Sequence, residues 1–330
     1  MSEQLAVMSL QQSGFVIQQA HALVQVQDAG RRGYAKVGVT EGGWLDATAA
    51  RLANALVDNP ANAAVLEIAL GGFRAEALGE CVIALTGANL PMTINGIAQS
   101  RYQRLQLVTG DIIEIGYANR QGARCYLAVH GGLQTPAMLG SRATVLREQL
   151  SPFAGGPLSA GQVLPYLPSR AYGSLSLPYA WHYRHRRFRR LSLVLGAQAA
   201  LLGPQLTKIC AQIYQVGPAA DRMGVRLQGR AVEMPALNLL SEGLCVGSVQ
   251  VPPDGMPIVM LRDHQTMGGY PKIGAICGQS QAWLGQALPG DFCQFEVIDA
   301  STAITRARSY ETKLAVIEQQ LREQAGAWRS

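Results

Sequence analysis

The chain has 330 residues, of which 48% are hydrophobic and 15% are charged, and it contains 36 glycines. This length commonly accommodates about two domains, and many glycines with few charges favour short strands and tight turns over a long helical bundle. No stretch reaches the ~18 apolar residues that a membrane-spanning helix requires, and the first 20 residues do not resemble a signal peptide. We therefore expect a soluble, cytoplasmic protein with no membrane partner.

The net positive charge of +6 is concentrated in one segment, which contains five arginines and no acidic residue (181–190, WHYRHRRFRR). Arginines interleaved with aromatic residues can bind nucleic acid. Domains that bind nucleic acid usually spread their positive charge over a whole face, so a solvated linker is the preferred interpretation. We expect no nucleic-acid partner.

In chain order, the sequence first predicts a strand within Phe15–Gln27, then a glycine-punctuated loop, then a helix over roughly Ala47–Val57. Strand-length apolar runs follow without intervening helices, at 65–70, 82–86, 92–94, 104–108, 112–117 and 125–129. Asn95-Gly96 lies between two of these runs and is a strong signal for a two-residue hairpin, because both residues accept a positive φ. The short spacing favours an antiparallel barrel over alternating strands and helices.

The segment 151–180 is rich in proline, glycine and serine. Together with the arginine run it is typical of a connection between domains, so we place the two domains at 1–190 and 191–330. The second domain is again rich in strands, with one helical stretch around Pro204–Cys210. Its predicted strands are 191–195, 213–216, 249–251, 258–261 and 292–298.

The end of the chain predicts an amphipathic helix that begins after Asp299. Leu314, Ile317 and Leu321 fall on one stripe of that helix, opposite its charged residues. The fold class is therefore mainly β, with few helices.

Several common sites are missing from the sequence. The six cysteines, at positions 81, 125, 210, 245, 277 and 293, form no C-x-x-C pair and no Cys/His cluster that could hold a metal. We expect them to be reduced and mostly buried. P-loop, Rossmann and nucleophile-elbow motifs are also absent. No cofactor site and no metal site can be identified within the chain.

The densest polar loop lies in the second half of the chain and surrounds two glycines. Gly268 and Gly269 would let the backbone approach a ligand closely. Arg262 and Lys272 can hold an anion, and Asp263 can orient Arg262 or act as a base. The alternative is that Arg262 and Asp263 form an ion pair that closes one end of a barrel.

Shorter polar turns offer further candidates, each of which either contacts a ligand or is satisfied locally by its own side chains. These turns are Asp221-Arg222, Ser241-Glu242, Asp254-Gly255 and His130 with the two glycines that follow it.

The loops also match, in order, the motifs of a known family. The matching segments are 27–31 (QDAGR), 43–46 (GWLD), 51–54 (RLAN), 85–88 (LTGA), 130–132 (HGG), 139–144 (LGSRAT), 221–227 (DRMGVRL), 240–243 (LSEG), 247–255 (GSVQVPPDG) and 263–274 (DHQTMGGYPKIG). Over roughly Val24–Ile298 the chain resembles the allophanate hydrolase subunit 2 family, also called biotin-dependent carboxyltransferase-like proteins. It departs from that pattern at Thr40-Glu41, where many relatives have Ser-Pro.

The resemblance implies two cyclophilin-like β-barrel domains. Within the family, chains of this size resemble the C subunits of bacterial 5-oxoprolinases. That implies a tight complex with a smaller cyclophilin-like B subunit, joint work with an A subunit, and ATP-dependent opening of 5-oxoproline to L-glutamate, with ATP and Mg²⁺ used by the complex.

Two alternatives stay open on the same resemblance. One is a regulatory binding protein that antagonises a kinase-inhibitor partner. The other is the biotin-dependent carboxyltransferase component of a urea-carboxylase-like system. The chain lacks the Met-Lys-Met-like turn of a biotin carrier, so in that case another protein would carry the biotin.

For the 5-oxoprolinase reaction we expect Lys272 and Arg262 to stabilise phosphoryl charge, and Asp263 to act as a base or to orient an arginine. Other residues would line the substrate cleft or the partner interface. They are Asp28, Arg31, His130, Asp221, Arg222, Ser241, Glu242, Asp254, Gln265, Thr266, Gly268, Gly269 and Tyr270.

Overall fold

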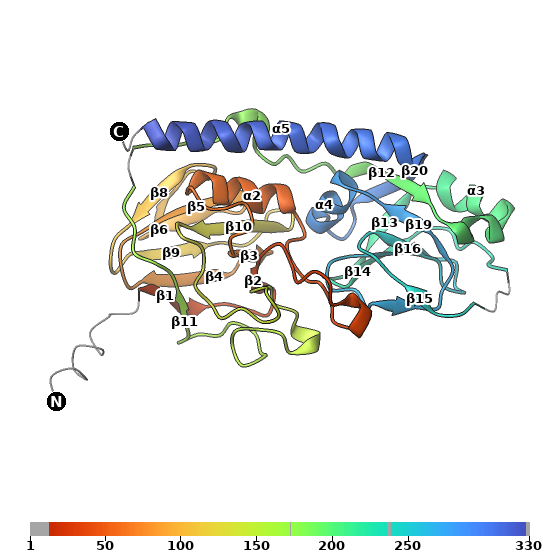
Figure 1. The fold of residues 1–330 in the computed structure, drawn as a ribbon, viewed down its shortest axis with the longest axis horizontal. Helices are drawn as coiled ribbons and strands as arrows, with labels where there is room; N and C mark the ends of the chain where they lie inside the picture. Colours follow the sequence, from red (N-terminus) through yellow and green to blue (C-terminus); the bar gives the residue numbers. More distant parts are fainter. Residues whose placement is uncertain (1–12, 172, 236–238, 328–330) are drawn as a thin grey trace. The chain divides into compact units, whose positions relative to one another are not determined.

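The computed structural model describes residues 13–171, 173–235 and 239–327, and the chain is mainly β with few helices (Figure 1), as expected. The strands are β1 (Gly14–Gln19), β2 (Val24–Gln27), β3 (Val65–Ala69), β4 (Phe73–Ala77), β5 (Cys81–Gly87), β6 (Met92–Ile94), β7 (Ile97–Ala98), β8 (Arg104–Leu107), β9 (Ile112–Ile115), β10 (Arg124–Val129), β11 (Val163–Pro165), β12 (Phe188–Leu195), β13 (Tyr214–Ala220), β14 (Gly224–Gln228), β15 (Glu242–Gly243), β16 (Ser248–Gln250), β17 (Ile258–Met260), β18 (Met267–Gly268), β19 (Lys272–Ile276) and β20 (Phe292–Ile298). The α-helices are α2 (Ala47–Leu56), α3 (Pro204–Ala211), α4 (Gln279–Gln286) and α5 (Ala300–Ala327), and the 3-10 turns are η1 (Ala35–Val37), η2 (Leu146–Glu148), η3 (Tyr179–Trp181) and η4 (Ala197–Leu202).

The chain divides into two compact units. Unit 1 comprises Met1–Ala29, Ala49–Tyr183 and Ile317–Ser330, and unit 2 comprises Gly30–Thr48 and Arg184–Val316. This division differs from the predicted one, whose boundary after residue 190 falls inside β12, a strand that pairs with β20 from its first residue. The sequence predicted that Gly30–Thr48 belongs to the N-terminal domain. It could not predict that this segment joins unit 2, because long-range hydrogen bonds hold it there.

Unit 1 contains two antiparallel sheets around one hydrophobic core. Their strand orders are β11-β1-β4-β9-β6-β7 and β2-β3-β10-β5-β8. Both sheets turn apolar side chains into the same core, among them Phe15, Leu66, Ile83, Ile113 and Leu127. The barrel expected for this half of the chain therefore takes the form of two sheets packed face to face.

The hairpin between β6 and β7 confirms the prediction made from Asn95-Gly96. Both residues have positive φ angles, 52° and 77°, as a two-residue type I′ turn requires. The flanking residues pair in register, Ile94 with Ile97 and Thr93 with Ala98.

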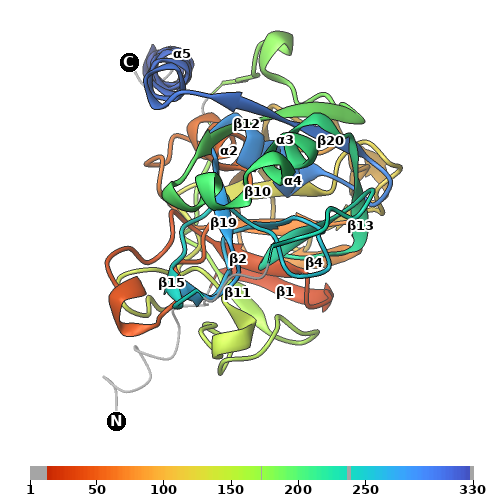
Figure 2. The same cartoon turned by 90° about the vertical axis from the view of Figure 1, so that its right-hand side faces the viewer.

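Unit 2 is built on a closed barrel with the strand order β12-β19-β16-β17-β14-β13-β20. β12 and β20 pair in parallel, and the other pairs of the barrel are antiparallel. α3 lies against β20 and α4 against β12 (Figure 2). The arginine run, interpreted above as a linker, ends inside the first strand of this barrel.

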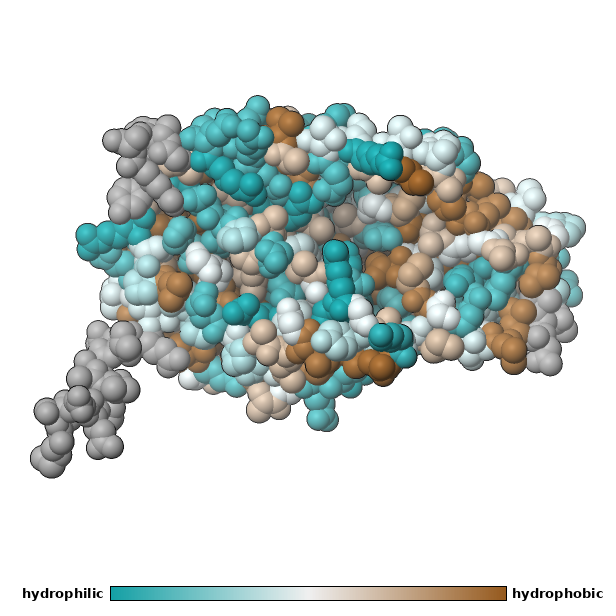
Figure 3. Space-filling view, viewed as in Figure 1, coloured by the Kyte–Doolittle hydropathy of each residue, from teal (hydrophilic) through white to brown (hydrophobic). Residues whose placement is uncertain are grey.

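Helix α5 confirms the amphipathic helix predicted after Asp299. The Asp299 carboxylate accepts hydrogen bonds from the backbone N–H of Thr302 (2.7 Å) and from two nearby hydroxyl groups, which explains why the helix begins there. Leu314, Ile317 and Leu321 are buried. The side of α5 that Figure 3 shows is mostly hydrophilic, and no helix in the described parts of the chain is long and apolar enough to cross a membrane.

Candidate functional site

A buried ion pair lies at one end of the unit 2 barrel. Arg222 precedes β14 and Asp263 follows β17, and these strands are antiparallel neighbours, so the two residues meet at the same end. Arg222 donates from Nε to Oδ2 of Asp263 (2.9 Å) and from Nη2 to Oδ1 (3.0 Å), and the Asp263 N–H donates to the Arg222 carbonyl (2.8 Å). This bidentate arrangement fixes the plane of the guanidinium group.

The segment 40–43 of unit 2 covers this pair. Arg222 Nη2 donates to the carbonyl of Gly43 (2.6 Å), and the Gly42 N–H donates to the carbonyl of Arg262 (3.2 Å). The first of these bonds joins residues 179 positions apart in the sequence. Such long-range bonds explain why the segment belongs to unit 2.

Arg262 pairs with Glu41, from the same covering segment, at 3.4 Å. The alternative drawn from the sequence paired Arg262 with Asp263, but the observed ion pairs are Arg262–Glu41 and Arg222–Asp263. We call these four residues the arginine–aspartate cluster. It presents two guanidinium groups, one buried and one partly exposed, and can bind a carboxylate or phosphate group at the exposed one.

Two further predicted residues adjoin the cluster. Gln265 offers its carbonyl to the buried His264, whose Nδ1 lies 2.6 Å away, and burial lowers the pKa of that imidazole. Thr266 contributes its carbonyl, which accepts from the Leu244 N–H (2.9 Å). Backbone groups of this loop therefore hold neighbouring segments together.

A second cluster surrounds Lys272. Its ammonium group lies 2.9 Å from the Glu242 carboxylate and donates to the Gly243 carbonyl (3.0 Å). β15, which contains both acceptors, pairs with β18, which contains Gly268. We call Ser241, Glu242, Gly268, Gly269 and Lys272 the lysine–glutamate cluster.

The two glycines of this cluster differ in what surrounds them. A Cβ at Gly268 would lie 2.6 Å from Nε2 of Gln250 and 2.8 Å from Leu244, so the glycine is required for packing. A Cβ at Gly269 would meet only the Ser241 hydroxyl, at 3.3 Å. Of the two, Gly269 leaves more room beside the backbone for a ligand. The next residue, Tyr270, is 48% exposed.

Two predicted acidic residues are satisfied within their own turns. Asp221 accepts from the N–H groups of Met223 (2.8 Å) and Gly224 (3.1 Å). Asp254 accepts from the Met256 N–H (3.1 Å) and forms an exposed ion pair with Arg226. The hydrogen bonds within each turn match the alternative in which the side chains of these turns are satisfied locally.

The remaining predicted residues are members of neither cluster. Asp28 and His130 belong to unit 1, where Asp28 accepts from the Ser141 hydroxyl (2.6 Å) and His130 Nδ1 lies 2.7 Å from the Val57 carbonyl. His130 lines a cavity of about 440 Å³ in that unit. Arg31 belongs to unit 2, where its side chain is buried and its N–H donates to the Glu41 carbonyl (2.8 Å).

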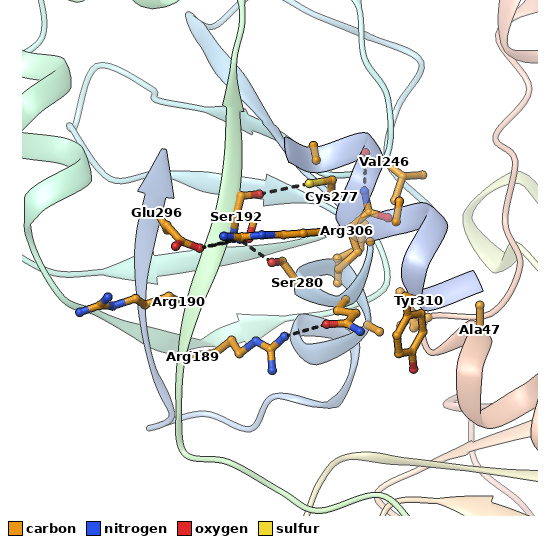
Figure 4. Close-up of a pocket in the computed structure, with 18 of the residues that line it drawn as sticks. Ala47, Arg189, Arg190, Ser192, Val246, Cys277, Ser280, Glu296, Arg306 and Tyr310 are labelled. Atoms are coloured by element: carbon orange, nitrogen blue, oxygen red, sulfur yellow. Dashed lines mark hydrogen bonds and ion pairs between the residues drawn. The ribbon is translucent and has the colours of Figure 1, made fainter. Parts of the chain in front are cut away.

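Unit 2 also contains a cavity of about 850 Å³, which we call the arginine cavity (Figure 4). Arg262 is the one predicted site residue that lines it. Its other polar lining residues are Arg186, Arg189, Arg190, Ser192, Gln279, Ser280, Gln281, Glu296, Arg306, Tyr310 and Glu311. Sequence reasoning missed this site because it assigned the arginine run to a linker. It also missed Glu41, although the departure from the family pattern at that position was a signal.

The described residues contain no candidate metal site, and the buried cysteines are unreactive. In residues 13–171, 173–235 and 239–327, no group of three or more His, Cys, Asp or Glu side chains could hold a metal ion. All six cysteines are free; three are buried, and burial raises the pKa of Cys81 and of Cys125 to about 12. Such thiols are poor nucleophiles at neutral pH.

Comparison with known proteins confirms the resemblance drawn from the motifs. A family model described as carboxyltransferase domain, subdomain A and B, matches residues 37–297, and the chain belongs to this family. The chain is also 34% identical over 307 residues to the C subunit of the 5-oxoprolinase of Escherichia coli (strain K12), and the match covers 88% of this chain and 94% of that protein.

Two solved structures are similar as well. The protein TTHA0988 is 33% identical with a TM-score of 0.77, and the match covers 86% of this chain and 56% of TTHA0988, so the chain spans about half the length of that protein. The urea carboxylase of Kluyveromyces lactis is 24% identical with a TM-score of 0.86, over 95% of this chain and 30% of that one. The second likeness concerns the fold alone.

Proposed function

Because this chain belongs to the family of the carboxyltransferase domain, subdomain A and B, we propose that it is the C subunit of an ATP-dependent 5-oxoprolinase. The complex would open the lactam of 5-oxoproline to L-glutamate with an A subunit and a smaller B subunit. The observation that carries this proposal is the match to the Escherichia coli C subunit over most of both chains. Within the family, that likeness favours 5-oxoproline over other substrates.

The proposed chemistry begins with the stability of the lactam. An amide is stabilised by resonance, so water attacks its carbonyl carbon slowly. Transfer of the γ-phosphoryl group of ATP to the amide oxygen makes that carbon a better electrophile. Water then adds, the ring C–N bond breaks, and a second water releases phosphate and leaves the glutamate carboxylate. Each step requires cations beside phosphoryl oxygens and donors for the substrate carboxylate.

Arg262 is the cation that we assign to this charge first. It lines the arginine cavity, and its side chain is 24% exposed. Lys272 is assigned the same role in second place, because it does not line that cavity and its acidic partner Glu242 lies closer (2.9 Å) than Glu41 does to Arg262 (3.4 Å). Both oxygens of Asp263 accept hydrogen bonds from Arg222, so we assign Asp263 to orienting that arginine rather than to general base catalysis.

The Mg²⁺ that accompanies ATP needs few ligands from the protein. It usually keeps several waters and binds through substrate phosphates and one or two carboxylates. Two carboxylates lie on the wall of the arginine cavity: Glu311, and Glu296, which is also paired with Arg306 (3.0 Å).

The reaction is tested by measuring glutamate release from 5-oxoproline and ATP, with this chain mixed with its candidate A and B subunits and with each protein omitted in turn. We expect glutamate only in the complete mixture. Assembly of the complex without glutamate release would overturn the proposal and favour the regulatory role.

The role of Arg262 is tested in the same assay. Arg262→Gln is expected to lower kcat/KM by about 10²-fold, the usual effect of removing one donor to a developing charge. Arg226→Gln is the matched control. Arg226 is also paired with an acid in unit 2, but its pair with Asp254 is exposed. It should leave activity unchanged. Equal losses in both variants, or full activity of Arg262→Gln, would contradict the assignment.

Carboxyl transfer from biotin is the second candidate. The description of the family and the fold shared with the Kluyveromyces lactis urea carboxylase favour it. It predicts that activity depends on a biotinylated partner and is abolished by avidin, whereas 5-oxoproline opening should be insensitive to avidin.

A further inference from the structure

The arginine cavity has an uneven charge. Five arginines and two glutamates line it. Arg306 lies between Ser192 and Glu296 and is paired with the glutamate at 3.0 Å (Figure 4). Arg262 is paired with Glu41 outside the lining. The excess positive charge therefore resides on the arginines of the run that enters β12.

Arg186 and Arg189 form no ion pair with an acidic side chain in the part of the chain that the structure describes. The side-chain contact of Arg189 is with a neutral acceptor, Oε1 of Gln279, at 3.3 Å. Burial, and after it the positive charge of Arg186, lower the pKa of Arg189 by more than Tyr310 and Glu296 raise it, so its charge is only partly compensated in this environment. A bound anion would relieve both effects.

The start of helix α4 adds to the attraction for an anion. Gln279, the first residue of the helix, and Gly278 before it both line the cavity. The aligned peptide dipoles of a helix favour negative charge near its N-terminus. The N–H groups of Ser280 and Gln281 already donate to the carbonyls of Cys277 and Gly278 (both 3.1 Å), so the helix contributes through its dipole. A Cβ built on Gly278 meets no atom within 4 Å, so the space beside the helix start is open.

Part of the wall is apolar. Leu45, Phe188, Val246, Leu261 and Ala307 line it, together with the ring of Tyr310. The volume of about 850 Å³ falls in the range of cavities that hold drug-sized ligands and greatly exceeds what a single inorganic anion would fill. The ligand that fits has a charged end and a larger uncharged body.

We propose that the arginine cavity binds a phosphorylated organic molecule, with its phosphoryl oxygens on Arg186 and Arg189, near the N-terminus of α4, and its uncharged body along the apolar part of the wall. A phosphate group carries up to two negative charges and can neutralise both arginines, whereas a carboxylate neutralises one. This inference rests on the proposed function, which already places phosphoryl charge beside Arg262 in the same cavity. Its test measures binding by this chain alone, so failure of binding and failure of glutamate release by the complex are separate results.

Binding is measured by titration calorimetry on the full chain with three probes: ATP, inorganic tripolyphosphate and glutarate. We expect ATP to bind more tightly than tripolyphosphate, because only ATP has an uncharged body, and both to bind at least about tenfold more tightly than glutarate. Glucose 6-phosphate as a fourth probe distinguishes a sugar body from a nucleoside body. Failure of all phosphate probes to bind, or binding of glutarate as tight as theirs, would overturn the proposal.

Two variants locate the binding. Arg189→Gln is expected to weaken ATP binding about tenfold, the loss of one hydrogen bond to a charged group. Arg187→Gln is the control: it removes one arginine from the same run, but Arg187 does not line the cavity and lies 3.9 Å from the carboxylate of Asp291. It should change affinity less than about twofold, as a screened exposed charge does. Equal weakening in both variants would indicate a diffuse charge effect and sink the assignment.

The Tm of each variant shows whether a loss of ATP binding comes from a disturbed fold. Without ligand, that variant should have a higher Tm than the native chain, because it removes a charge held next to Arg186. Arg186 itself is exposed, so Arg186→Gln should also weaken ATP binding while folding normally. Normal ATP affinity in a folded Arg186→Gln protein would count against the site.

Cysteine alkylation provides a local readout. Cys277 lines the cavity, whereas Cys210 lies on α3, and both are partly buried thiols whose pKa burial raises. Bound ATP should slow alkylation of Cys277 by N-ethylmaleimide and leave Cys210 unaffected, as read by mass spectrometry. If no phosphate probe protects Cys277 and Arg189→Gln instead weakens assembly with either candidate partner, the cavity is a protein contact and the proposal is wrong.

Discussion

Unit 1 and unit 2 each bury charged groups, but they neutralise them to different degrees. In unit 1, Glu67 accepts from the Tyr126 hydroxyl (2.8 Å) and lies 3.4 Å from Arg124, and all three belong to paired strands of one sheet. Unit 2 pairs Arg222 with Asp263 just as closely. It also holds Arg189 in a cavity beside another arginine and against a neutral acceptor.

The difference separates charges that serve the fold from charges that serve a ligand. A charge that is buried, or half-buried as that of Arg189 is, costs free energy without an opposite partner, so a fold retains one where something else compensates it. In unit 1 the compensation comes from the next strand. In the arginine cavity we assign it to a bound phosphate. If the paired charges serve the fold, removing one of them should cost stability in proportion to its burial.

Asp263→Ala should lower the free energy of unfolding by about 3–5 kcal/mol, because it leaves the buried Arg222 guanidinium without its partner. Asp254→Ala is the matched control, since Asp254 pairs with Arg226 at the surface, and it should cost no more than about 1 kcal/mol. Urea denaturation monitored by circular dichroism measures both. Similar costs for the two variants would show that the Arg222–Asp263 pair is not the structural anchor of its end of the barrel.

Glu67→Gln is the corresponding change in unit 1. It removes the charge but keeps the shape, so the Tyr126 and Arg124 contacts weaken, and we expect a loss of about 1.5–3 kcal/mol. Glu114→Gln, in the exposed pair with Arg74, should lose no more than about 1 kcal/mol. The same denaturation experiment compares them, and an unchanged midpoint for Glu67→Gln would refute a structural role for that charge.

The smallest effect is expected from His264 and depends on pH. Burial lowers its pKa and outweighs the attraction of Glu41 and Asp263, while Arg262 lowers the pKa further. Between the lowered pKa of the folded state and the ordinary histidine pKa of about 6.5, the folded protein therefore binds fewer protons than the unfolded chain. The contribution of His264 to stability is complete above that pH and is lost as the pH falls toward the lowered value.

The test compares the native chain with His264→Gln between pH 7.5 and 5. The difference in unfolding free energy between them should become less favourable to the native chain as the pH falls. A constant difference across this range would mean that the imidazole titrates alike in the folded and unfolded states.

The site was only partly predictable from the sequence. The motifs that identified the family include Arg222, Asp263 and Lys272, because these residues lie in short conspicuous loops. Their partners did not follow from the motifs. Lys272 binds Glu242, about 30 residues away, and Asp263 binds Arg222 at a sequence separation of 41. The alternative Arg262–Asp263 pair relied on adjacency in sequence, whereas the closing of the barrel brings other residues together.

The sequence by itself determined the local structures that depend on residues close together in the chain. The positive φ angles that Asn95 and Gly96 accept fix the β6–β7 hairpin, and Asp299 with the apolar stripe that follows fixes the start and buried face of α5. Only the tertiary structure decided that 30–48 joins unit 2 and that the arginine run enters a barrel strand beside a cavity. Those outcomes depend on strand register and on hydrogen bonds between distant segments, whose free energy exists only once the barrel has closed.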